Sequence, residues 1–133
     1  MSLRKALQEK SFVVTAELYP PRGTDCTEYL QKARVLKGLA DGVNVTDNQL
    51  AMMRMSPLAF SALLVKEGLD PIMQMALRDR NTMAMQSDIL GATALGIRNM
   101  LIITGDPVRE DNPIKPKAVF ELDLISVLKM IKR

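Results

Sequence analysis

The stretch from Leu95 to Pro107, LGIRNMLIITGDP, decides the fold class. Gly96 ends a helical segment, a run of buried-strand residues follows over 99–103, and the polar tripeptide Thr104-Gly105-Asp106 comes directly after it. Sheets of α/β proteins bind their ligands where loops leave the carboxyl ends of parallel strands. We therefore expect the Asp106 carboxylate to lie at a ligand site.

The same order of strand, polar strand end and helix recurs along the chain. Apolar runs and Gly/Pro punctuation predict strands over 12–18, 43–46, 71–77 and 99–103, and helices over 3–8, 27–37, 57–65, 82–95 and 122–131. Regular alternation of strands and helices predicts a parallel sheet with right-handed crossovers. The fold is therefore either an open doubly wound sheet or part of a (β/α) barrel, and residues 1–133 form a single domain.

The length limits how much of a barrel is present. A complete eight-unit barrel needs about 200 residues or more, and this chain has 133, so four units make at most half of one. A half-barrel exposes two strand edges and one apolar face. We therefore expect it to form a homo-oligomer or to be completed by another chain.

Composition excludes several classes of protein. The net charge of +3 comes with 4% aromatic residues and no block of like charges, which is unlike a nucleic-acid binder. Cys26 is the only cysteine, so no internal disulfide forms, and the chain has neither a long apolar span nor a signal region. We expect a cytoplasmic protein with no nucleic-acid partner and no membrane role.

The sequence contains no histidine. This removes the commonest general base and the commonest metal ligand, so we expect neither a Ser-His-Asp triad nor a metal site. Ten methionines follow apolar faces, where flexible filling of the core explains them better than soft-metal binding. Proton transfer is left to a carboxylate, a lysine, a tyrosine or the single thiol.

Several motifs, in matching order, resemble the methylenetetrahydrofolate reductase family. They are AELYPPRG (16–23), VNVTDN (43–48), RDRN (78–81), ALGIRN (94–99) and ITGDP (103–107). The resemblance covers nearly the whole chain and corresponds to the N-terminal half of the family's FAD-dependent (β/α) barrel. The fold class it implies is α/β, of the TIM-barrel type, with about the first four β-α units present.

The resemblance also implies an activity. It is the reduction of 5,10-methylenetetrahydrofolate to 5-methyltetrahydrofolate by hydride that passes from NAD(P)H to FAD and then to the folate, in one-carbon metabolism and methionine biosynthesis. We expect this chain to act as part of a longer or multi-subunit enzyme. The alternative, from another class, is a catalytically silent half-barrel that serves as a folate- or flavin-binding or assembly module.

Two carboxylates match the family's catalytic and substrate-binding positions. Glu17 corresponds to the general acid that protonates a folate ring nitrogen, and its neighbours Ala16, Leu18 and Tyr19 are expected to provide low-dielectric surroundings that raise its pKa. Asp106 corresponds to the aspartate beside flavin and pterin. The alternatives are a capping or salt-bridged Glu17 and an Asp-Pro turn at Asp106.

Further positions match contacts to the flavin. The cofactor-binding residues implied by the resemblance are Thr46, Asp47, Gln74, Ile103, Thr104, Gly105 and Asp106. Gln74 stands where many family members have histidine, and glutamine cannot titrate. Gly105 is expected to let the backbone approach a flat cofactor closely. Thr46 is alternatively a simple loop cap at a strand end.

Two arginines follow the third predicted strand. Guanidinium groups bind phosphate bidentately, so Arg78 and Arg80 are candidates for the FAD pyrophosphate, but an Arg-Asp-Arg cluster also forms internal ion pairs. We favour the structural role for Arg78 and leave both roles open for Arg80.

Overall fold

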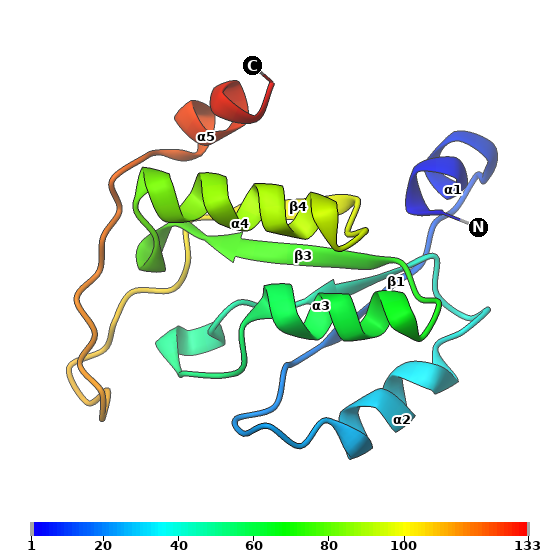
Figure 1. Cartoon of the computed structure of the whole chain (residues 1–133), viewed down its shortest axis with the longest axis horizontal. Helices are drawn as coiled ribbons and strands as arrows, with labels where there is room; N and C mark the ends of the chain where they lie inside the picture. Colours follow the sequence, from blue (N-terminus) through cyan, green and yellow to red (C-terminus); the bar gives the residue numbers. More distant parts are fainter. Residues whose placement is uncertain (1, 133) are drawn as a thin grey trace.

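A computed structural model describes residues 2–132 and confirms the predicted alternation of strands and helices (Figure 1). The elements in chain order are α1 (Leu3–Glu9), β1 (Thr15–Leu18), α2 (Thr27–Val35), β2 (Gly42–Val45), η1 (Gln49–Ala51), α3 (Pro57–Lys66), β3 (Pro71–Ala76), η2 (Leu77–Asp79), α4 (Thr82–Ala94), β4 (Asn99–Ile103) and α5 (Leu124–Ile131). No helix in this described range is long and apolar enough to span a membrane.

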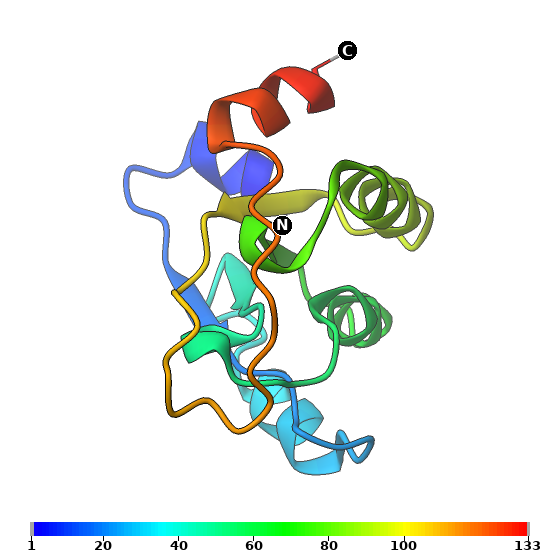
Figure 2. The ribbon, with the colours of Figure 1, turned by 90° about the vertical axis from the view of Figure 1, so that its left-hand side faces the viewer.

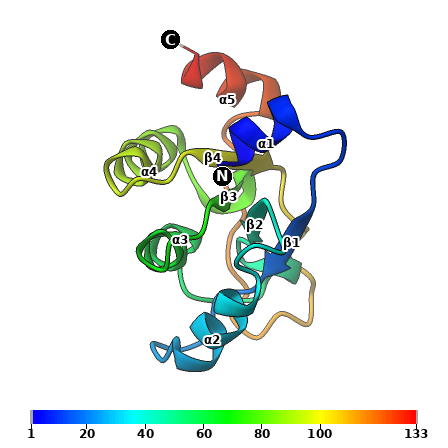
Figure 3. The same cartoon turned by 90° about the vertical axis from the view of Figure 1, so that its right-hand side faces the viewer.

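The sheet decides between the two α/β architectures. Its four strands are parallel and follow chain order, β1-β2-β3-β4, with Glu17 opposite Asn44 and Gln74 opposite Leu101. A doubly wound sheet reverses its strand order at a switch point, and this sheet does not. Helices α2, α3 and α4 cover one face, while no helix of residues 2–132 runs along the other (Figures 2 and 3). The chain is therefore an arc of a (β/α) barrel.

Helix α1 closes the amino ends of the strands. The Leu3 N–H donates to the Asp70 carboxylate at 2.6 Å, and the Asn99 side chain donates to the same carboxylate at 2.9 Å. A Cβ at Gly42 would lie 3.1 Å from the Ile72 side chain and 3.4 Å from that of Leu3. Glycine at this position therefore lets α1 sit against the sheet, at the end opposite the polar strand termini.

Two apolar clusters hold the helices on the sheet. One joins β2 to α2 and α3 and is built from Ala33, Val43, Val45, Phe60 and Leu64. The other joins β3 and β4 to α4 and α5 and includes Met73, Met75, Met85, Ile102 and Val127. Methionine fills irregular gaps well because its side chain is unbranched, and these three methionines are at most 1% exposed.

Three element ends differ from the prediction by two residues or more, and one of them is the end of α2, at Val35 rather than at residue 37. β1 begins at Thr15 rather than at residue 12, because the Val14 backbone bonds to Asp41 instead of to a neighbouring strand. Phe12 remains 79% exposed. The last helix begins at Leu124 because the Asp123 carboxylate accepts the Ser126 N–H at 2.8 Å and caps it.

Apolar surface remains uncovered near β4. Leu101, on the face of the sheet without helices, is 43% exposed. Helix α5 presents further exposed apolar side chains: Leu124, Ile125, Leu128 and Ile131. Within residues 2–132, β1 and β4 each have a neighbouring strand on one side only. These are the features that half of a barrel is expected to expose.

Candidate active site

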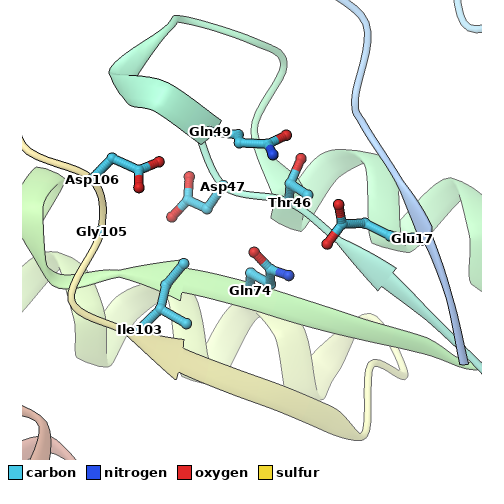
Figure 4. A pocket seen from close by; sticks show the side chains of 8 residues that line it. All are labelled: Glu17, Thr46, Asp47, Gln49, Gln74, Ile103, Gly105 and Asp106. Carbon is cyan, nitrogen blue, oxygen red and sulfur yellow. The ribbon is translucent and has the colours of Figure 1, made fainter.

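A cavity of about 280 Å³ lies at the carboxyl ends of the strands (Figure 4). All four strands or the loops after them contribute to its lining: Glu17, Thr46, Asp47, Gln49, Gln74, Ile103, Gly105 and Asp106. Ligand pockets have volumes from roughly 300 Å³ upward. The cavity is therefore slightly smaller than a typical pocket that holds a whole small-molecule ligand.

The structure brings most of the residues predicted for the site together around this cavity. Of the eight residues expected at the site, only Thr104 does not line it. The Thr104 side chain is exposed, and its carbonyl accepts the Arg78 N–H at 3.1 Å. Gln49 also lines the cavity and was not predicted, although its position three residues after Thr46, in the same strand-end loop, was an available signal.

Glu17 and Asp106 lie at opposite ends of this one cavity (Figure 4). Glu17 is solvent-exposed. Successive side chains of a strand point to opposite faces, so Leu18 packs against the β2–α2–α3 cluster and does not enclose the Glu17 carboxylate. The apolar enclosure expected for Glu17 is therefore absent, and its carboxylate is open to water as well as to the cavity.

Asp106 fixes a strained loop beside the cavity. Its Oδ2 accepts the Leu50 N–H at 2.7 Å. Asn48, Leu50 and Ala51 have φ of 44°, 57° and 56°, which costs an L-residue about 1–2 kcal/mol each. The Asn112 side chain also holds this loop, donating to the Ala51 carbonyl at 2.8 Å. Asp106 is thus more than a turn residue, since its carboxylate joins the loops after β2 and β4.

Arg78 lies beneath the same loops, with its side chain 1% exposed. Its guanidinium donates to the carbonyls of Asp106 at 2.9 Å and Asn48 at 3.1 Å, and to both Asp79 oxygens at 2.7 Å. These contacts confirm the structural role favoured for Arg78. Burial would raise the pKa of Asp79, but the hydrogen bond and charge of Arg78 outweigh it and lower that pKa.

Arg80 is also used inside the chain. Its Nη1 donates to Asp47 at 2.5 Å and its Nε to Asp88 at 2.8 Å, with the side chain 12% exposed. Burial would lower the pKa of Arg80, but the Asp47 charge and these hydrogen bonds raise it, so Arg80 stays charged. These ion pairs support the structural role over pyrophosphate binding.

Two residues that line the cavity each have a buried side-chain oxygen with no hydrogen-bond partner within residues 2–132. These oxygens are Asp47 Oδ1 and Thr46 Oγ1. Asp47 Oδ2, by contrast, accepts the Ala76 N–H at 2.8 Å as well as Arg80. An unsatisfied buried polar atom costs about 1–3 kcal/mol. A ligand that donates hydrogen bonds here would remove this cost.

Gly105 is required by packing within the chain. Its φ is +92°, and a Cβ there would lie 3.1 Å from the Cβ atoms of both Ala76 and Arg78. The missing side chain therefore lets the β4 loop lie against the end of β3. This reason differs from the close cofactor approach expected from the sequence.

Fold and site together define an α/β protein of the (β/α)-barrel type with a cavity lined by three carboxylic acid side chains at the carboxyl ends of its strands. Residues 2–132 match the family model described as methylenetetrahydrofolate reductase, and the chain belongs to this family. Membership indicates an oxidoreductase of folate one-carbon metabolism. A search of curated proteins found no match.

Proposed function

We propose that this chain takes part in the FAD-dependent reduction of 5,10-methylenetetrahydrofolate to 5-methyltetrahydrofolate, with NAD(P)H as electron donor. The observation that carries the proposal is the cavity itself, in which Glu17, Asp47 and Asp106 meet at the carboxyl ends of parallel strands. Loops at these strand ends are where barrel enzymes place their chemistry.

The lining residues fit the isoalloxazine ring of FAD. Asp47 Oδ1 and Thr46 Oγ1 are buried and require hydrogen-bond partners, which the polar edge of the ring offers. The amides of Gln49 and Gln74 both donate and accept, and Ile103 provides an apolar contact for a flat ring. Bound FAD supplies the hydride that the folate receives.

Glu17 is the proton donor in this proposal. Opening the imidazolidine ring of the folate requires protonation of a ring nitrogen, and Glu17 is a solvent-exposed carboxyl group on the lining of the cavity. Its exposure to solvent lets it regain a proton from water after each turnover.

Asp106 provides negative charge at the other end of the cavity. The cation that develops on the opened folate ring is stabilised by a carboxylate held in place before the reaction. The hydrogen bond from the Leu50 N–H and the fixed position of the Asp106 carbonyl on Arg78 both hold this group.

We also propose that the chain works in the cytoplasm within a longer or multi-subunit enzyme. The larger assembly is supported by β1 and β4, which each have a neighbouring strand on one side only within residues 2–132, and by the exposed apolar residues of α5, because an edge strand and an uncovered apolar face favour association. The remaining surface of the FAD and the folate would contact the part that covers them.

Flavin absorbance tests the proposal. The protein, purified with any subunit that accompanies it, should be yellow after addition of FAD and gel filtration, should bleach with NADH or NADPH, and should regain its colour with methylenetetrahydrofolate. A protein that holds FAD yet never regains colour with the folate would instead be the silent flavin-binding module. A colourless protein would contradict flavin binding altogether.

A further inference from the structure

The two oxygens of the Asp47 carboxylate differ in their hydrogen bonds. Oδ2 accepts two hydrogen bonds, from the Ala76 N–H at 2.8 Å and from Arg80 Nη1 at 2.5 Å. Oδ1 is buried and has no partner within the part of the chain that the structure describes, and Asp47 is one of the residues that line the cavity. The Asp47 side chain is 0% exposed, so bulk water does not satisfy this oxygen either.

The chemistry of a carboxylate determines which kind of group can pair with Asp47 Oδ1. A carboxylate paired with a guanidinium only accepts hydrogen bonds, and Asp47 pairs with Arg80 through Oδ2. The partner is therefore a hydrogen-bond donor that enters the cavity. Thr46 Oγ1, the other unpartnered buried atom of the lining, can donate as well as accept, so it adapts to whatever atom lies next to that donor.

We infer that Asp47 Oδ1 accepts a ring N–H from a planar N-heterocycle, and that this contact selects the ligand of the cavity. The inference rests on the proposed function and deepens it. An imide or lactam edge places an N–H beside a carbonyl, and the amides of Gln49 and Gln74 on the same cavity provide donors for that carbonyl (Figure 4).

Both heterocycles of the proposed reaction present such an edge. Flavin carries an N–H at N3 between two carbonyls, and pterin carries an N–H at N3 next to one carbonyl. The shared chemistry is the ring N–H, and the two sources are separated by testing each ring with and without a methyl group on N3.

The surroundings of Asp47 make one substitution informative. In Asp47→Asn, the Ala76 N–H and Arg80 are both donors and hold the amide oxygen in the place of Oδ2. The amide NH₂ then takes the place of Oδ1. A single atom of the cavity changes from acceptor to donor while the volume of the side chain stays nearly the same.

The experiment measures dissociation constants of four probes by fluorescence and calorimetry: lumiflavin, N3-methyllumiflavin, 6-methylpterin and N3-methyl-6-methylpterin. The protein should bind the N–H form of one ring pair about ten-fold or more tightly than its methylated form, as expected for a charge-assisted hydrogen bond. Asp47→Asn should lose that preference. The pair that responds identifies the source.

Asp88→Asn is the matched control. It makes the same chemical change at the other carboxylate bound to Arg80, outside the cavity lining, and should leave all four dissociation constants unchanged. The comparison of methylated and unmethylated probes on the unsubstituted protein needs no variant, so it remains decisive even when Asp47→Asn does not fold.

The outcomes separate the inference from the proposed function. Tight binding of a flavin or pterin with no preference for the N–H form would overturn the role of Asp47 and leave the proposed function standing. Preference retained in a folded Asp47→Asn variant would also overturn it. Failure of the unsubstituted protein to bind any of the four probes would contradict the proposed function, and the inference with it.

Discussion

Replacing Arg78 with methionine should destabilise the fold strongly, because this buried guanidinium joins the loops that form the cavity. Methionine leaves the carbonyls of Asp106 and Asn48 without their charged donor. Hydrogen bonds to a charged group contribute about 1.5–3 kcal/mol each. The pair with Asp79 adds less, since that carboxylate is 26% exposed and regains water. We expect the free energy of unfolding to fall by about 3–5 kcal/mol.

Urea denaturation followed by circular dichroism measures this change. With a slope of about 2 kcal/mol per molar urea, the midpoint should fall by roughly 1.5–2.5 M. Arg34→Met is the matched control, because Arg34 forms a similar two-pronged pair with Glu67 but is 54% exposed. That variant should lose less than about 1 kcal/mol. Equal midpoints for the two variants would refute the role assigned to Arg78.

Four further predictions follow from the site. Glu17→Gln should keep flavin reduction by NAD(P)H but slow folate reduction by about 10²–10⁴-fold; stopped-flow traces that show equal loss in both half-reactions would contradict its role as acid. Asp106→Asn should raise the flavin potential, since an anion becomes neutral, and a spectroelectrochemical titration giving an unchanged potential would place Asp106 away from the ring. Gly105→Ala should cost about 1–3 kcal/mol in urea denaturation, because the new Cβ would lie 3.1 Å from two others at a φ of +92°; an unchanged midpoint would argue against the packing reason. Burial alone would raise the pKa of Asp79, but the hydrogen bond and charge of Arg78 lower it on folding. The stabilisation that ionised Asp79 gives the fold is therefore complete above about pH 4 and is lost as the pH falls through the lowered pKa. This acid loss should be smaller in Arg78→Met, and identical pH profiles would contradict the pairing.

The strands were readable because buried parallel strands leave a direct mark on the sequence, whereas their pattern left two strand orders open, and only the family resemblance pointed to the barrel order that the sheet has. The runs over 71–77 and 99–103 are apolar, and glycine or proline bounds each. The segment before Thr15 looked like strand for the same reason, but its Val14 backbone bonds to Asp41 and not to a neighbouring strand. The start of β1 depends on pairing with residues distant in sequence, and a local sequence pattern holds no information on that pairing.

The site was readable to the extent that it depends on strand ends. Glu17 lies one residue before the end of β1, Thr46 and Asp106 follow β2 and β4, and the topology brings such positions together. The loop around Leu50 was not foreseeable, since it takes left-handed φ at residues other than glycine. The apolar enclosure expected for Glu17 is absent because successive side chains of β1 point to opposite faces of the sheet, so Leu18 lies on the face covered by helices.

The position of bound flavin tests the central claim most directly. A crystal structure of the protein with FAD should place the isoalloxazine ring in the cavity between Glu17 and Asp106, with a ring nitrogen within hydrogen-bond distance of Asp47 Oδ1 or a neighbouring lining atom. A ring bound elsewhere, for example in the hollow near Asp41 and Asp70 at the amino ends of the strands, would contradict the account.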